Sequence, residues 1–124
     1  MKILLDTHIL IWYLEDNSRL SQRFCSQIVD LDNQIYFSSV SIAEMAIKAS
    51  KGKLTYPEDF VDQCLNQGFD ELVLTSSHSL LLKKLPMHHF DPFDRLLICQ
   101  AIFEGCFLMT QDGLFDKYDL EILK

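Results

Sequence analysis

The sequence predicts an α/β domain with a central, mostly parallel sheet of four or five strands flanked by helices. The first observation is that short apolar runs alternate with longer segments of helical periodicity, which is typical of strands joined by helical crossovers. The second is that the 124 residues contain no internal repeat or linker, which suits one domain spanning 1–124. The third is a hydrophobic content of 48%, sufficient for a core without disulfide or zinc support.

The first part of the chain is predicted to alternate strand and helix. Residues 2–6 form an apolar run that is too short for a helix, and 8–14 are predicted to form a short helix. Ser18 is a favourable N-cap for a helix over 22–30, in which the apolar residues share one face. A second strand is expected over 34–38.

The middle of the chain continues this alternation. A helix over 41–51 is expected to end at Gly52, since glycine readily adopts the backbone conformation that closes a helix. Pro57 is expected to open the next helix, with two acidic residues beside the free amide groups, and Gly68 to stop it. A third strand is expected over 71–74.

The last third of the chain is predicted to contain a short helix, a strongly apolar helix and the remaining strands. Ser76 or Ser77 is expected to cap the short helix over 79–84. A loop between two prolines leads to the apolar helix over 93–103, which Gly105 closes. The elements that follow are a fourth strand at 107–110, a helical turn at 113–118 and an edge strand at 120–123.

The composition argues against several classes of protein. No apolar stretch approaches the roughly 20 residues that span a bilayer, and the first apolar run is too short for a signal peptide, so we expect a cytoplasmic protein without membrane contact. The four cysteines form no C-x-x-C pair, which favours reduced, buried thiols. The formal charge of −7 counts against a simple polyanion-binding protein. It leaves room for a nucleic-acid enzyme whose bound metal offsets the acidic charge locally.

The residues that could carry chemistry are four acids distant in sequence, namely Asp6, Glu44, Asp94 and Asp112. Asp6 and Asp112 follow apolar runs, and Asp94 lies in the first turn of the apolar helix between them. Because the carboxyl ends of parallel strands meet at one edge of a sheet, these acids should gather there. Crowded carboxylates repel one another unless a cation lies between them. Mg²⁺ or Mn²⁺, as one or two ions, prefers such oxygen ligands.

Three of these acids also have a purely structural explanation. Asp6 would be a favourable N-cap for the helix that follows it. Asp112 begins an Asp-Gly dipeptide, which is a strong turn signal. Asp91 would cap the apolar helix with proline at its first position, and Asp94 would interact with the helix dipole. This last explanation is weaker for Asp94, because the helix that follows is apolar almost all round and should be buried.

Glu44 has the strongest structural explanation. Ser41-x-x-Glu44 matches a capping box, and Glu44 forms a favourable i,i+4 pair with Lys48. Taken alone, this polar stripe is expected to face solvent. Arg95 could likewise pair with one of the neighbouring acids.

Four segments of the chain occur in an order and spacing that resembles PIN domains and, more narrowly, the VapC toxins of bacterial toxin–antitoxin pairs. The segments are Leu4-Leu5-Asp6-Thr7-His8, Ser39-x-Ser41-x-x-Glu44, Asp91-Pro92-Phe93-Asp94-Arg95-Leu96-Leu97-Ile98 and Thr110-x-Asp112-x-x-Phe115. The resemblance covers nearly the whole chain. It implies a Rossmann-like sheet with the four acids in one pocket.

The resemblance also implies an activity and partners. The implied activity is that of a Mg²⁺- or Mn²⁺-dependent endoribonuclease, which hydrolyses phosphodiester bonds of RNA. The implied partners are an antitoxin, encoded nearby, that blocks the pocket, and a second copy of the chain in a homodimer. The family's catalytic and metal-binding acids match Asp6, Glu44, Asp94 and Asp112. Its supporting residues match Thr7, Thr110, Asp91 and Asp116.

Further contacts with RNA are expected near these acids. Lys48 or Arg95 would contact the RNA backbone, unless either one pairs with an acid instead. His88 and His89 adjoin the Asp91–Asp94 segment and could touch substrate, although their roles stay open.

Three alternatives remain. The chain could be a PIN-fold nuclease outside toxin–antitoxin systems, or a catalytically weak PIN scaffold that binds RNA or a partner. A more remote alternative is a phospho-receiver signalling domain, which shares the length, the parallel sheet and an acidic Mg²⁺ site. Such a domain usually needs adjacent acids after the first strand and an aspartate ending the third. Here Thr7 follows Asp6 and the third strand is expected to end at Leu74-Thr75, so the receiver pattern is not met.

Overall fold

A five-stranded parallel sheet forms the centre of the computed structural model, which describes residues 1–88, 90–118 and 120–123. The strands are β1 (Lys2–Leu5), β2 (Gln34–Ser38), β3 (Asp70–Leu72), β4 (Phe107–Met109) and β5 (Ile122–Leu123). The α-helices are α1 (Thr7–Glu15), α2 (Gln22–Val29), α3 (Ser39–Ser50), α4 (Phe60–Asn66), α5 (Ser76–Leu80) and α6 (Pro92–Glu104). Two 3₁₀ helices, η1 (Leu81–Lys83) and η2 (Gly113–Lys117), complete the fold.

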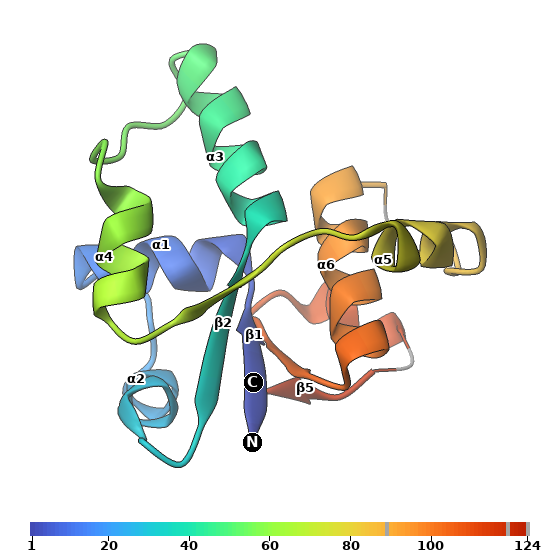
Figure 1. Ribbon diagram of the computed structural model, residues 1–124, viewed down its shortest axis with the longest axis horizontal. Coiled ribbons are helices and arrows are strands. Elements are labelled where there is room, and N and C mark those ends of the chain that lie inside the picture. Colours follow the sequence, from blue (N-terminus) through green and yellow to red (C-terminus); the bar gives the residue numbers. More distant parts are fainter. Residues whose placement is uncertain (89, 119, 124) are drawn as a thin grey trace.

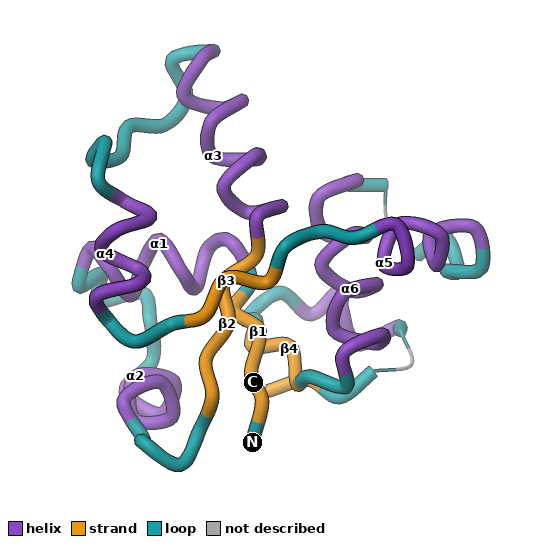
Figure 2. Tube along the Cα trace, in the orientation of Figure 1, coloured by secondary structure: helices purple, strands orange, loops and turns teal. Residues whose placement is uncertain are grey.

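The helices lie on both sides of the sheet (Figures 1 and 2). Successive side chains of β1 point to opposite faces, so Ile3 and Leu5 enter one hydrophobic core while Leu4 enters the other. The first core is closed by α1, α2 and α4, and the second by α6 and η2. These findings confirm the predicted α/β fold with a parallel sheet.

The order of the strands positions the functional edge. The sheet runs β3-β2-β1-β4-β5, with every neighbouring pair parallel. Strands β2 and β3 therefore lie on one side of β1, and β4 and β5 lie on the other. The strand order reverses between β1 and β4, which is the switch point of the topology. Ligands of open parallel sheets bind outside the carboxyl ends of the strands at such a point. Leu5 pairs with Met109 there, so the residues that follow these two lie side by side.

Three predicted helix caps were wrong. The N-cap of α2 is Ser21 rather than Ser18, and its hydroxyl accepts a hydrogen bond from the Phe24 amide at 3.2 Å. Helix α3 begins two residues earlier than expected with Ser38 as its N-cap, so Ser41 and Glu44 do not form a capping box. Thr75, rather than either following serine, caps α5. Each of these segments offers several hydroxyl residues, and the docked position of the helix selects among them.

The start of α4 also differs from the prediction. The helix begins at Phe60, three residues beyond Pro57, and Asp59 makes no capping hydrogen bond with its side chain. Gly68 follows the helix with a φ of 85°.

Helix α6, by contrast, has the predicted ends. Asp91 Oδ1 accepts hydrogen bonds from the Phe93 and Asp94 amides, and proline occupies the first turn. Gly105 closes the helix with a φ of 67°, a conformation that strains any residue with a Cβ atom. Asp94 is thereby fixed in the first turn, at the carboxyl edge of the sheet.

Two composition-based expectations can be compared with the structure. All four cysteines are free, and Cys64, Cys99 and Cys106 are buried. Among the described residues, no helix is long and apolar enough to cross a membrane.

Candidate active site

Asp6 occupies the junction between β1 and α1. Its side chain is buried and accepts two hydrogen bonds, one from the Ile9 amide at 2.8 Å and one from the Thr110 hydroxyl. Its backbone amide donates to the Met109 carbonyl at 3.1 Å. Asp6 is therefore the predicted N-cap of α1, and its carboxylate is also locked against the end of β4.

Asp112 follows β4 and forms the predicted turn. One of its carboxylate oxygens accepts from the Leu114 amide at 2.9 Å, which caps η2, while the rest of the side chain is exposed. Its backbone amide donates to the Thr110 hydroxyl oxygen at 3.1 Å. Thr110 thus donates to Asp6 and accepts from Asp112, so one buried hydroxyl joins the two strand ends.

Glu44 is buried, with 3% of its surface exposed, which overturns the expectation that its stripe faces solvent. Its Oε2 atom accepts from Lys48 Nζ at 2.7 Å. Its Oε1 atom is buried and has no hydrogen-bond partner among the residues that the structure describes. The reason is that α3 also buries Val40, Ser41 and Met45, so the polar stripe turns toward the interior.

Asp94 is the acid on which the charges of the other three act. Burial and, after it, the negative charges of Asp91, Glu44, Asp6 and Asp112 together raise the pKa of Asp94 to about 7. Burial likewise raises the pKa of Asp6, against the lowering effect of its two hydrogen bonds. Like charges within interaction range disfavour ionisation, so the other three acids selected from the sequence lie within electrostatic range of Asp94.

The carboxylates are near one another but are not gathered around a single point. Within the described residues, no group of three or more His, Cys, Asp or Glu side chains is arranged closely enough to hold a metal ion. Two features nevertheless fit a hard cation: the buried, unpartnered Glu44 Oε1 and the disfavoured charge on Asp94. An oxygen-binding divalent cation would relieve both.

The predicted supporting residues lie around this cluster. Thr7 is buried, and its hydroxyl lies 2.9 Å from that of Ser41, which joins α1 to α3. Asp91 caps α6, as described above. Asp116 lies on η2 with an exposed side chain. The hydroxyl of Thr7 therefore aligns the helices that carry Asp6 and Glu44.

The two cations proposed to touch RNA differ in their positions. Lys48 is 44% exposed in its side chain, and its pKa is raised by the hydrogen bond to Glu44 and by the charges of Asp91 and Asp94. Arg95 is buried and donates to the carbonyls of Pro86 at 2.9 Å and Leu85 at 3.3 Å. Arg95 therefore fastens the loop before α6, and Lys48 is the better candidate for contact with substrate.

His88, in the loop before α6, packs against an aromatic residue near the end of the chain. The ring of His88 lies against Tyr118, with centroids 4.9 Å apart. His89 lies outside the described residues, so its suggested contact with substrate stays a prediction.

The sequence analysis did not single out the polar residues beneath the site. Gln100 is fully buried in α6, where its Oε1 accepts from the Ser38 hydroxyl and its Nε2 donates to the Leu72 carbonyl at 3.3 Å. These bonds tie α6 to the ends of β2 and β3. A signal was present, because Gln100 is the one polar residue between Leu96 and Phe103.

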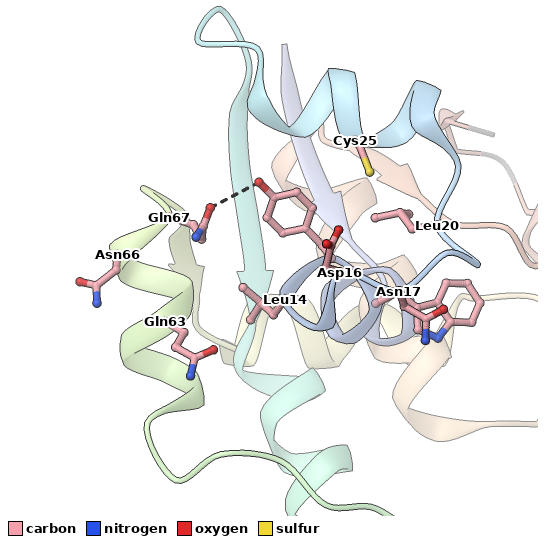
Figure 3. Close-up of a pocket in the computed structure, with 10 residues that line it drawn as sticks. Leu14, Asp16, Asn17, Leu20, Cys25, Gln63, Asn66 and Gln67 are labelled. Carbon is pink, nitrogen blue, oxygen red and sulfur yellow. Dashed lines mark hydrogen bonds between the residues drawn. The ribbon is translucent and has the colours of Figure 1, made fainter.

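The hollow at the carboxylates is small. It has a volume of about 260 Å³ and is lined by Asp6, His8, Ile9, Trp12, Gln111 and Asp112. A larger hollow of about 470 Å³ opens between the end of α1, α2 and α4 (Figure 3). Its polar lining is mainly amide side chains, with Asp16 as the one carboxylate, so the larger hollow lacks the chemistry of the smaller one.

The chain matches the family model described as the PIN domain over residues 3–121. It therefore belongs to the PIN domain family, a membership that supports nuclease chemistry and not a phospho-receiver function. No curated protein is significantly similar to the chain in sequence.

Several solved structures share the fold across the full length of the chain. The crystal structure of VapBC2 from Rickettsia felis bound to a DNA fragment from their promoter contains a chain with a TM-score of 0.76 and 18% identity, covering 99% of this chain and 98% of that chain. The structure of VapBC-1 from nontypeable Haemophilus influenzae contains a chain with a TM-score of 0.69 and 20% identity, covering 100% of this chain and 98% of that chain. The crystal structure of FitAcB from Neisseria gonorrhoeae contains a chain with a TM-score of 0.67 and 19% identity, covering 98% of this chain and 96% of that chain.

Proposed function

We propose that this protein is a metal-dependent endoribonuclease that hydrolyses phosphodiester bonds of RNA, and that it is the toxin of a VapBC-type toxin–antitoxin pair. The observation that carries the proposal is that Asp6, Glu44 and Asp112 all lie within electrostatic range of Asp94, whose pKa burial and then these charges raise to about 7. A cluster of carboxylates at the switch point of a parallel sheet is suited to an ion-assisted reaction on a phosphate.

The four acids would hold one or two Mg²⁺ or Mn²⁺ ions. Such an ion, when bound, offsets the negative charge of the phosphate and favours deprotonation of water near neutral pH. The chain's own residues fix the geometry. Thr110 and the Ile9 amide hold the Asp6 carboxylate in one orientation, because both of its oxygens accept a hydrogen bond. Lys48 holds one oxygen of Glu44 and leaves the other, Oε1, free to ligate.

Lys48 would also contact the RNA backbone. Its ammonium group lies close enough to Asp91 and Asp94 for their charges to raise its pKa, so it stays protonated beside the cluster. A partly exposed cation in this position can meet a phosphate oxygen that enters the site.

The assignment to a toxin–antitoxin pair is supported by the structural relatives. Two of the relatives above are VapBC complexes, and they match this chain over nearly its whole length. We therefore propose a cognate antitoxin as the protein partner, and a homodimer as the assembled form of the toxin.

Cleavage of total cellular RNA by the purified protein would test the activity. Cleavage should require Mg²⁺ or Mn²⁺, stop in EDTA, and fall at least a hundredfold in Asp94→Asn. Asp62→Asn is a matched control, because Asp62 is exposed in the first turn of α4 and makes no part of the cluster. Equal cleavage by wild type and Asp94→Asn would refute the site.

One observation favours a second candidate, the catalytically weak PIN scaffold. The described acids are not arranged closely enough to hold a metal ion without movement. Calorimetric titration with Mn²⁺ separates the two, since a scaffold would release no binding heat that depends on Asp94.

A further inference from the structure

Two adjoining hollows share an aromatic pair on α1. The first is the hollow of about 260 Å³ that contains Asp6 and Asp112. The second, of about 300 Å³, lies between α1 and the segment that ends α3, and its residues include Arg19, Lys48 and Lys53. His8 and Trp12 line both hollows. The two rings therefore stand between the hollow that contains Asp6 and Asp112 and the one that contains Arg19 and Lys53.

The position of these rings follows from the start of α1. Because Asp6 caps the helix, His8 lies in its first turn and Trp12 lies one turn further on the same face. Their ring centroids are 5.7 Å apart with planes inclined by 38°. His8 is exposed and Trp12 is partly exposed, so the pair presents ring surface at the edge of the site.

The cations reach this surface from two separate turns. At the end of α3, Gly52 has a φ of 70° and the Lys53 amide donates to the Lys48 carbonyl at 2.9 Å, which turns the chain back toward α1. Arg19 comes from the loop after α1. Both side chains are exposed, and neither forms an ion pair within the part of the chain that the structure describes.

The charge of this hollow contrasts with that of the whole protein. Three of the 11 lysines and arginines line it, against one carboxylate, Glu15, in a chain with a formal charge of −7. Lys48 is paired with Glu44, so Arg19 and Lys53 supply the cationic charge that is left for a ligand. Cations that alternate with aromatic rings are suited to a nucleic-acid strand, since the cations attract phosphates and the rings stack with bases. An apolar peptide would use the rings but would gain little from Arg19 and Lys53.

We propose that this trough binds an unpaired nucleotide of the RNA strand beside the bond to be cut, with its base stacked on Trp12 and His8. The flanking phosphates would lie near Arg19 and Lys53. The inference rests on the proposed nuclease function and deepens it by naming the residues that would bind a base beside the bond to be cut. A paired base is already stacked in its helix and offers no free face to Trp12.

Trp12 supplies its own probe, because it is the only tryptophan in the chain. In EDTA, which prevents metal-dependent cleavage, a short single-stranded oligoribonucleotide should quench its fluorescence at low salt. The same sequence as a duplex should quench far less. Heparin, a polyanion without bases, should also leave the fluorescence nearly unchanged.

Matched variants separate stacking from charge. Trp12→Leu keeps an apolar side chain but removes the ring, and should weaken binding of a labelled single strand on the order of tenfold. Trp12→Phe keeps an aromatic ring and should retain most of the binding affinity. In cleavage, the loss should appear in KM more than in kcat. Arg19→Gln with Lys53→Gln should reduce the salt dependence of binding by about 1.4 in log–log slope. Lys83→Gln with Lys84→Gln, on exposed lysines of the η1 turn, should leave it unchanged.

The outcomes distinguish this inference from the proposed function. If single strands do not quench Trp12, or if heparin and duplex quench it equally, the stacking site is refuted even where RNA is cleaved. If single strands quench Trp12 but the protein never cuts RNA with Mg²⁺ or Mn²⁺, the stacking site stands and the nuclease is refuted. Unchanged affinity in Trp12→Leu, with the fold confirmed by circular dichroism, would also overturn the inference.

Discussion

Replacing Asp94 with asparagine should stabilise the metal-free protein above neutral pH. Burial and four neighbouring carboxylates raise the pKa of Asp94 from 3.8 to about 7. Each pKa unit corresponds to about 1.4 kcal/mol, so the full shift would amount to about 4 kcal/mol. Asp94 is partly exposed and solvent screens its charge, which reduces the expected gain to about 1–2 kcal/mol. The lost helix-dipole interaction, about 0.3–1 kcal/mol, opposes this gain and is smaller.

The sign of the pH dependence follows from the direction of this shift. The native state binds the Asp94 proton more tightly than the unfolded chain does. Below the unfolded pKa of 3.8, Asp94 is protonated in both states and imposes no penalty on folding. As pH rises from there through about 7, the wild-type protein loses stability because the native carboxyl must ionise against its neighbours. Asparagine cannot ionise, so the advantage of Asp94→Asn should grow across this window.

Urea denaturation in EDTA at pH 5 and pH 8 measures the effect. The difference in unfolding free energy between Asp94→Asn and wild type should be larger at pH 8. Asp62→Asn should show no such increase, because Asp62 lies outside the cluster on α4. Addition of Mn²⁺ should favour the wild type, since a ligand that binds only the folded state at a hundred times its Kd stabilises it by about 2.7 kcal/mol. An advantage that is equal at both pH values would refute the electrostatic reasoning.

Two further substitutions test the contacts that hold the carboxylates. Lys48→Met should lower the free energy of unfolding, measured in urea, by about 1–2 kcal/mol, because it leaves Glu44 buried without its cation. Adding Glu44→Gln should restore most of that loss. A double mutant no more stable than the single one would contradict the pairing. Thr110→Val should destabilise by about 1–3 kcal/mol through the lost hydrogen bond to Asp6. It should also slow RNA cleavage, and a normal rate would show that Thr110 does not orient that carboxylate.

The sheet was predictable from the sequence because its signals are local. The strands other than β3 are short, mainly apolar runs, and the structure places all five within about two residues of the predicted positions. The convergence of Asp6 and Asp112 was also predictable, since both follow parallel strands that meet at one edge. That convergence needs no knowledge of side-chain packing.

The environment of Glu44 was not predictable from its own helix. A narrow stripe of Ser41, Glu44 and Lys48 has the same pattern whether it faces water or a polar site. The docking of α3 against α1, through the contact between Ser41 and Thr7, decides whether this stripe faces water or the site. Arg95 shows the same limit, because its binding to the Pro86 carbonyl depends on a loop whose path the sequence does not specify.

An acidic chain is compatible with an RNA substrate here, because the exposed cations of Arg19 and Lys53 and the carboxylates of Asp6 and Asp112 line different hollows. Asp94 and Asp6 resist ionisation, since the pKa of each is raised, so protons would compete there with a bound cation for the same oxygens. A phosphate could not approach this cluster unaided. The cations of Arg19 and Lys53 line the second hollow, on the other side of the rings of His8 and Trp12 from Asp6 and Asp112, where the flanking phosphates would pass. RNA affinity should therefore depend on salt through the trough, and cleavage should depend on metal through the carboxylates, as two independently removable properties.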